Sequence, residues 1–326
     1  MKRGLISALI LFFLSQFIKK FPDKSVNLIV CDVGQGDAIL IQQGFFQVLI
    51  DTGPDEAVTA CLERHLPFTD KKIDVLILTH YDSDHIGGFA SLVSNYQFTR
   101  IFAPLSDKKE SELFLELNSL FLQLIQQGTV IKQPILGQQI AYQDSSLEEL
   151  NQSLLFTFLT PAHLEYDFLR SFNFFQADSR LPETTLSALN SKNFANFQAQ
   201  ESTNNRSISL LLDYGPMRVF LSGDLEEEGE LSILQSALID QVDILKVAHH
   251  GAKTSSSRAF LSQVQPEIAL ISVGKDNQFG HPSPEVLDDL QAIFCQIFRT
   301  DQIGDIKIKL FKDHYCVLNK KNNFCK

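Results

Sequence analysis

Short runs of apolar, often β-branched residues recur along the chain, and most end in a cluster of polar residues and glycines. Residues 26–33 and 46–50 are two such runs, and each is followed by a turn that contains aspartate and glycine. Runs of this length predict buried strands. The stretch 111–127 instead repeats its apolar residues every three or four positions, which predicts an amphipathic helix. Because strands and helices alternate in this way, we expect an α/β fold.

Side chains that can bind metals lie at the ends of several predicted strands. The apolar run 73–78 leads directly into the array H-x-D-x-D-H at residues 80–85, followed by two glycines. Asp224 follows the predicted strand 217–221, and tandem histidines follow the predicted strand 242–248. Imidazole and carboxylate groups on such loops can converge on one or two divalent ions. The spacing therefore favours a metal site over a merely solvated polar loop.

The array resembles the H-x-H-x-D-H signature of the metallo-β-lactamase superfamily, with Asp82 where most members have a second histidine. This variant is similar to the extracytoplasmic hydrolase domain of ComEC-type competence proteins and to related phosphodiesterases such as phosphorylcholine esterases. The resemblance extends over residues 25–319 through further motifs. These are D-V-G-Q-G-D-A at 32–38, L-I-D-T-G at 49–53, S-G-D at 222–224, H-H-G at 249–251 and G-H-P at 280–282. Ala252 departs from the family pattern, which has serine after H-H-G. The implied fold is the four-layer αββα sandwich.

The resemblance implies a hydrolase in which two divalent ions, zinc or manganese, activate the attacking water. The expected ligand sets are His80, Asp82, Asp224 and His249 for one ion, and Asp84, His85, Asp224 and His281 for the other. Asp224 is expected to bridge the two ions. A carboxylate at position 82 shifts the metal preference from zinc alone toward manganese or zinc.

Supporting roles are expected for further residues around the two ions. The expected catalytic residues are the ligand Asp84 together with His250, Lys253 and Asn205. His250 is expected to be a hydrogen-bond donor behind the ligands or a proton shuttle, and it could exchange roles with His249. Lys253 is expected to hold a phosphate group that Asn205 orients, or else to be a solvated loop lysine. Asp37 and Asp51 are expected either to orient metal ligands or to be ordinary turn residues.

The N-terminus begins with Lys2 and Arg3, followed by an apolar run over residues 5–18 that two lysines close. This pattern predicts a signal peptide or a short membrane anchor over residues 1–21, with a buried helix as the alternative. We therefore expect an extracytoplasmic domain, secreted or anchored to the cytoplasmic membrane. The five cysteines contain no C-x-x-C pair, which disfavours a thiolate zinc site. Cys316 and Cys325 could form a disulfide, although their spacing does not decide it, and at least one thiol stays outside any intrachain pair.

The net charge of −11 disfavours strong non-specific binding to DNA, but bound metal ions could still coordinate the phosphate of a substrate. Residues 162–204, rich in Phe, Asn, Gln and Ser, are expected to be an insertion or an active-site flap. The expected substrate is a phosphodiester, with single-stranded DNA as the leading candidate. A phosphodiester of a wall or lipid polymer, a lactam, or a non-catalytic metal-binding module are the alternatives. With one short apolar segment, the chain is not expected to transport DNA by itself.

Overall fold

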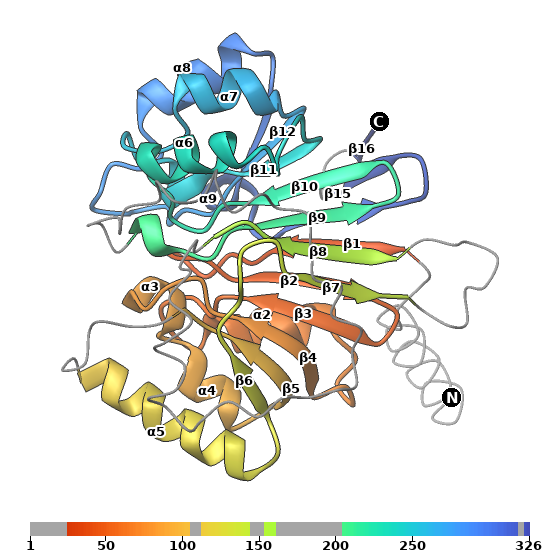
Figure 1. The fold of residues 1–326 in the computed structure, drawn as a ribbon, viewed down its shortest axis with the longest axis vertical. Coiled ribbons are helices and arrows are strands. Elements are labelled where there is room, and N and C mark those ends of the chain that lie inside the picture. The colour runs from red at the N-terminus through yellow and green to blue at the C-terminus, as the bar shows by residue number, and fades with distance from the viewer. Residues whose placement is uncertain (1–24, 105–111, 144–152, 161–203, 319–322) are drawn as a thin grey trace, which may run out of the picture.

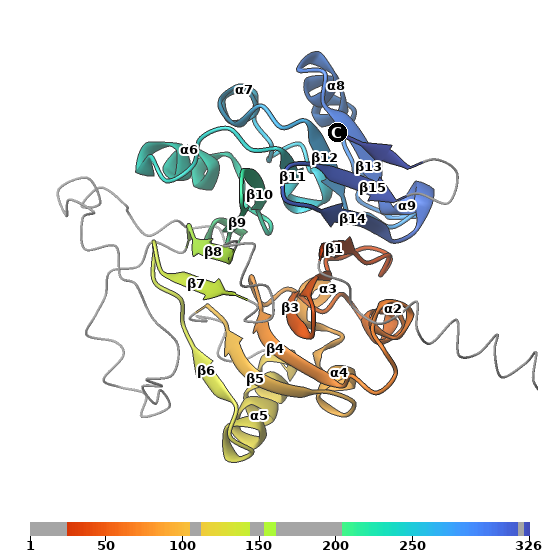
Figure 2. The same ribbon diagram turned by 90° about the vertical axis from the view of Figure 1, so that its right-hand side faces the viewer.

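The computed structural model describes residues 25–104, 112–143, 153–160, 204–318 and 323–326. The expected signal peptide or anchor and residues 162–203 of the expected insertion lie outside this part of the chain. The described residues form two β-sheets, and helices cover the outer face of each sheet (Figure 1 and Figure 2).

The first sheet consists of the N-terminal strands together with three strands from the C-terminal end. In spatial order its strands are β16 (Phe324–Cys325), β15 (Tyr315–Leu318), β14 (Ile306–Leu310), β1 (Val26–Val30), β2 (Ile39–Gln43), β3 (Phe46–Ile50), β4 (Lys72–Ile77), β5 (Gln97–Phe102) and β6 (Val130–Lys132). The strands β3 to β6 run parallel to one another. Their connections contain the helices α2 (Ala57–His65), α3 (Ser83–Ile86), α4 (Phe89–Val93) and α5 (Glu112–Gln126).

The second sheet comes from the rest of the chain and has its own parallel half, β10 to β13. In spatial order its strands are β13 (Gln296–Arg299), β12 (Ile268–Ile271), β11 (Ile244–Lys246), β10 (Met217–Leu221), β9 (Leu210–Tyr214), β8 (Leu154–Phe158) and β7 (Gln139–Tyr142). The helical elements of this half are η3 (Asn204–Arg206), α6 (Glu227–Ser236), η4 (Ala248–Gly251), α7 (Arg258–Val264), α8 (Pro284–Ala292) and α9 (Thr300–Ile303).

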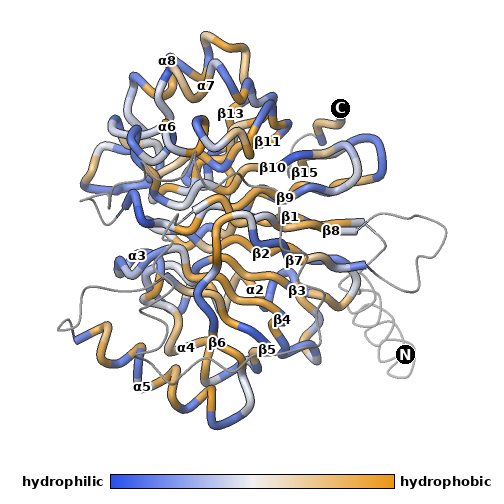
Figure 3. Tube along the Cα trace, viewed as in Figure 1, coloured by the Kyte–Doolittle hydropathy of each residue, from blue (hydrophilic) through white to orange (hydrophobic). Residues whose placement is uncertain are grey.

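Alternate side chains of each strand enter different layers of the core. In β1, Leu28 and Val30 pack between the two sheets, whereas Ile29 packs between the first sheet and its helices. A third cluster lies between the second sheet and the helices α6, α7 and α8, and includes Phe220 and Phe260. Figure 3 shows the hydrophobic residues concentrated along the strands. Three core layers between four structural layers define an αββα sandwich, which confirms the expected fold class.

The parallel strands bring the loops of the expected site to one edge of each sheet. Ile50 at the end of β3 pairs with Ile77 at the end of β4, so the segments that follow both strands lie side by side. In the second sheet, Leu221 at the end of β10 pairs with Lys246 at the end of β11. Loops at the carboxyl ends of parallel strands are the usual place for a binding site in such sheets.

Two disulfides link neighbouring elements. Cys31, directly after β1, pairs with Cys61 in α2, and Cys316 of β15 pairs with Cys325 of β16, while Cys295 is buried and free. The Cys316–Cys325 disulfide is the pairing that the sequence left undecided, whereas the sequence did not predict the Cys31–Cys61 disulfide. Disulfides persist in oxidising compartments, which indicates an extracytoplasmic location. Among the described residues, no helix is both long enough and apolar enough to cross a membrane.

Candidate metal centre

The loop after β4 carries the H-x-D-x-D-H array and is fixed by close backbone packing. Helix α3 begins directly after Asp82, which puts Asp84 and His85 in the same helical turn. The carbonyl oxygen of Asp84 accepts a hydrogen bond from the backbone N–H of Asp37 at 3.2 Å. The same oxygen lies 2.2 Å from the position that a Cβ at Gly36 would occupy. Only glycine fits there, so the turn at residues 34–37 approaches the metal loop as closely as the sequence predicts.

Three histidines direct Nε2 toward the carboxylate of Asp224, which follows β10. Asp224 Oδ2 lies 3.8 Å from Nε2 of His80, 3.3 Å from Nε2 of His85 and 3.8 Å from Nε2 of His250. These four side chains are almost completely buried. They come from both sheets, so the site lies where the carboxyl ends of β4, β10 and β11 meet.

The opposite ring nitrogen, Nδ1, of each histidine is held by the protein. His85 Nδ1 donates to Asp51 Oδ2 at 2.8 Å, and His250 Nδ1 donates to the carbonyl of Ser272 at 2.9 Å. His80 Nδ1 lies 3.1 Å from Oγ1 of Thr79, whose own hydroxyl donates to Asp51 Oδ2 at 2.6 Å. The Thr79 oxygen is therefore free to accept from His80. A proton held on Nδ1 leaves Nε2 as the nitrogen that can bind a metal.

The polar atoms at the centre of this arrangement lack hydrogen-bond partners. Nε2 of His80, His85 and His250 and Oδ1 of Asp224 are all buried without one. Buried polar atoms are almost always satisfied, and a metal ion would satisfy all four here. Imidazole nitrogens together with carboxylate oxygens are a donor set that suits zinc and manganese. The residues present therefore fit divalent cations.

The electrostatics of the centre match this donor set. Burial opposes ionisation of Asp224, but His85 and His250 outweigh it and hold the pKa of that carboxyl well below its ordinary value. Burial also opposes a charge on His85, yet Asp224 and Asp51 raise the pKa of its imidazole well above the usual range. At His80, burial together with the nearby His85 lowers the pKa. A divalent cation can replace protons in such a cluster of carboxylates and imidazoles.

Two carboxylates lie on the solvent side of the histidines. Asp84 Oδ2 is 3.3 Å from His250 Nε2, and Asp82 Oδ2 is 3.7 Å from His80 Nε2. Their side chains are 31% and 36% exposed, in contrast to the buried histidines. Among the described residues, close groups of ligand atoms include His80 with His85 and Asp224, and Asp84 with His85 and His250. Such buried His/Asp clusters are typical of the binuclear centre of the superfamily named above.

Both tandem histidines lie at the centre, beside Asp224. His250 lies beside Asp84 and His85, where the sequence assignment put His281. His249 Nε2 is also 3.8 Å from Asp224 Oδ2, and its ring centre is 5.8 Å from that of His281. His249 and His250 both have left-handed backbone angles, with φ of 49° and 54°, and their rings lie 6.3 Å apart. Such a conformation costs on the order of 1–3 kcal/mol per residue and is concentrated at functional sites.

The two residues expected to bind phosphate lie at the periphery. Asn205 is buried, and its Oδ1 accepts hydrogen bonds from the backbone N–H groups of Glu226 and Gly229 at the start of α6. It therefore fixes the turn that follows Asp224. Lys253 is largely exposed and pairs with Glu285 at 3.3 Å. A role of either residue in phosphate binding stays a prediction.

Sequence reasoning missed Lys246, the last residue of β11. Its side chain is completely buried, and Nζ lies 2.7 Å from Asp37 Oδ2. The other oxygen of Asp37 lies 3.5 Å from His250 Nδ1. A lysine flanked on both sides by apolar residues at 244–248, three residues before the tandem histidines, was a signal that could have identified it.

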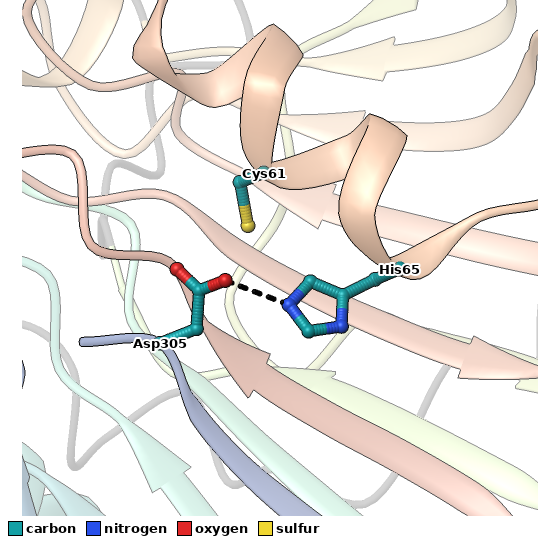
Figure 4. A group of neighbouring side chains, drawn as sticks. All are labelled: Cys61, His65 and Asp305. Atoms are coloured by element: carbon teal, nitrogen blue, oxygen red, sulfur yellow. Dashed lines mark hydrogen bonds and ion pairs between the residues drawn. The ribbon is translucent and has the colours of Figure 1, made fainter. Parts of the chain in front are cut away.

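A second group of ligand-type side chains has a structural role. Cys61, His65 and Asp305 lie close together between α2 and β14 (Figure 4). The sulfur of Cys61 forms the disulfide to Cys31, so no thiolate is present to bind a metal. Asp305 instead accepts hydrogen bonds from Arg64 at 2.8 Å and lies 2.8 Å from His65 Nε2. This group ties the helix to the edge of the first sheet.

Fold and site together define a metallo-β-lactamase-type protein, and comparison with known families agrees. The chain belongs to the Metallo-beta-lactamase superfamily, whose sequence profile matches residues 31–275. The family resemblance carried by the H-x-D-x-D-H array is thereby confirmed. At the coarser level of the family, the chain is a metal-dependent hydrolase of the ComEC-like kind.

Individual relatives come from several bacteria. The chain is 29% identical to ComE operon protein 3 of Bacillus subtilis (strain 168), in a match that covers 95% of this chain and 36% of that protein. It is 24% identical to Recombination protein 2 of Haemophilus influenzae, over 97% of this chain and 33% of that protein. The chain thus spans about a third of these relatives. Among solved structures, the metallo-beta-lactamase fold protein YhfI from Bacillus subtilis aligns with a TM-score of 0.48 and 13% identity, over 84% of this chain and 95% of that one.

Proposed function

We propose that the chain is a metal-dependent phosphodiesterase and that single-stranded DNA is its substrate. The observation that supports this most strongly is the convergence of three unpartnered histidine nitrogens on Asp224. One of the relatives is named for recombination, and a further similar protein is Competence protein ComA of Neisseria gonorrhoeae, at 24% identity. We extend to this chain the action on DNA that those names suggest.

In this proposal the residues hold two divalent ions, zinc or manganese. Such ions, when bound, act as Lewis acids toward the phosphodiester and lower the pKa of water. One ion would be held by His80, Asp82, Asp224 and His249, and the other by Asp84, His85, Asp224 and His250. This set replaces His281 of the sequence assignment with His250. Asp224 lies between the two groups and would bridge them.

The protein's own groups set the geometry of this site before substrate arrives. Asp51 fixes the His85 ring through Nδ1, and it accepts from the backbone N–H of Thr79 at 2.7 Å as well. The buried histidines exclude water from the inner side of the site, while the partly exposed Asp82 and Asp84 leave the outer side open. A phosphodiester can therefore approach the centre from the side of these two carboxylates. Their charge disfavours a polyanion until metals are bound, so metal binding and substrate binding should be coupled.

The test is a substrate panel with the purified chain loaded with Mn²⁺ or Zn²⁺. The panel contains single-stranded DNA, bis-p-nitrophenyl phosphate, phosphorylcholine esters and a cephalosporin. We expect cleavage of both the single-stranded DNA and the chromogenic diester. Asp224→Asn serves as the inactive control. Cleavage of phosphorylcholine esters alone would assign the site to a wall or lipid phosphodiester, and metal loading without cleavage of any phosphodiester would overturn the proposal.

A further inference from the structure

An aromatic ring is exposed next to the metal centre. The side chain of Phe279, in the loop between β12 and α8, is 68% exposed. Its ring stacks on His281 with centroids 5.7 Å apart and an interplanar angle of 13°. His281 in turn lies against His249, and His249 Nε2 is 3.8 Å from Asp224 Oδ2. The exposed ring is therefore separated from the centre by only two imidazoles.

The loop that presents this ring is held by its own hydrogen bonds. Asn277 Nδ2 donates to the carbonyls of Gly274 at 2.9 Å and His281 at 2.8 Å, while its Oδ1 accepts from the backbone N–H of His281 at 3.0 Å. The backbone N–H of Gly274 donates to Oε1 of Gln35, in the turn that also contacts the metal loop. The loop that carries Phe279 is thus fixed, and the outward face of the Phe279 ring is available without rearrangement of the loop.

We propose that Phe279 is a stacking platform for a nucleobase of the substrate, next to the phosphate at the metal centre; this proposal rests on the proposed function. A phenyl ring offers each base a π-face of similar quality, so the contact would tolerate any sequence. A nucleobase fits this ring because His281 covers one of its faces, while the other face is flat and apolar and is directed toward solvent. An acidic chain gains little from non-specific phosphate contacts, so stacking would supply the affinity that charge does not.

The experiment compares two oligonucleotides that differ only beside the scissile phosphate, where one carries 2-aminopurine and the other an abasic residue. Both carry a cleavage-resistant phosphorothioate for the binding measurement. The Mn²⁺-loaded chain should bind the base-containing strand roughly tenfold more tightly and quench its fluorescence, as expected for one stacked base. In Phe279→Leu both the preference and the quenching should disappear, and Phe279→Trp should restore them.

The matched control is Phe68→Leu, because Phe68 has an equally exposed ring, at 69%, in the loop after α2. This variant should keep the full preference for the base. If Phe279→Leu keeps both preference and quenching, the stacking proposal is wrong, and the ring serves some other contact such as one with a protein. Failure of the proposed function gives a different result, since the parent chain would then cleave no phosphodiester in the panel.

Discussion

Lys246 and Asp37 form an ion pair that is closed off from solvent, with Nζ 2.7 Å from Oδ2 and both side chains buried. Lys246 ends β11 of the second sheet, and Asp37 lies in the turn between β1 and β2 of the first sheet. The pair therefore clamps the two sheets together directly behind His250, whose Nδ1 is 3.5 Å from Asp37 Oδ1. Burial opposes ionisation of Asp37, but Lys246 and His250 keep its pKa far below the ordinary value.

Removal of the Lys246 charge should destabilise the fold and loosen the metal centre. Lys246→Met leaves the Asp37 carboxylate buried without its partner, which costs about 3–5 kcal/mol for a broken buried pair. Urea denaturation should show this loss in the free energy of unfolding, and chelator competition should show weaker metal binding. The double variant Lys246→Met/Asp37→Asn should recover part of the stability because no buried charge stays unpaired. Equal stability of the single and double variants would contradict the clamp.

The Asp51 carboxylate should set the metal affinity through His85. The Asp51 carboxylate accepts hydrogen bonds from His85 Nδ1 and from both the hydroxyl and the backbone N–H of Thr79, so it fixes two residues of the metal centre. In Asp51→Asn we expect about 10–100-fold weaker metal binding, as for other groups that orient a histidine ligand. Competition with a fluorescent chelator measures it. Asp305→Asn changes a carboxylate that contacts none of the histidines of the centre and should leave the metal affinity unchanged. A similar loss in both variants would argue against this role.

Asp224 lies within 3.8 Å of Nε2 of His80, His85, His249 and His250, so its loss should affect both ions. We expect Asp224→Asn to lower the bound metal to less than one equivalent, measured by elemental analysis after gel filtration. Asp213→Asn is the matched control, because Asp213 pairs with Arg218 near the protein surface. A variant at position 224 that retains two ions and full activity would exclude a bridging role.

The local pattern of the sequence predicted an α/β fold and the loops of the site, whereas the four-layer αββα arrangement was implied by the family resemblance. The strand before residue 80 and the strand before Asp224 end where their apolar runs end, and the parallel pairing of their sheets brings those ends to one edge. The position of His250 beside Asp84 and His85 could not be predicted from spacing. It depends on the left-handed backbone at residues 249 and 250, with which both adjacent rings bring Nε2 to 3.8 Å from Asp224 Oδ2. Lys246 was missed because the sequence shows only a lysine within an apolar strand. Its role is evident only once the structure shows its partner, Asp37.

The Cys31–Cys61 disulfide illustrates the same limit. No sequence spacing connects a cysteine after the first strand with one in the following helix, 30 residues away. Their pairing follows from the way α2 packs on the first sheet, which is a tertiary property. The pairing of Cys316 with Cys325 was easier to anticipate because the two residues face one another on adjacent strands of one hairpin.

The last prediction concerns acid stability and Asp305. Burial raises the pKa of this carboxyl, but hydrogen bonds to His65 and Arg64 outweigh burial and leave the pKa below its ordinary value. A carboxyl with a depressed folded-state pKa stabilises the fold fully above its unfolded pKa, about 3.9, and loses that contribution as the pH falls toward the folded pKa. Asp305→Asn should therefore be less stable than the parent at pH 7, and the gap should shrink steadily as the pH falls below about 4. Urea midpoints across pH 2.5 to 7 would measure the gap, with Asp313→Asn, at an exposed carboxylate, as the control. A gap that stays constant over this range would show that Asp305 acts through packing rather than through its charge.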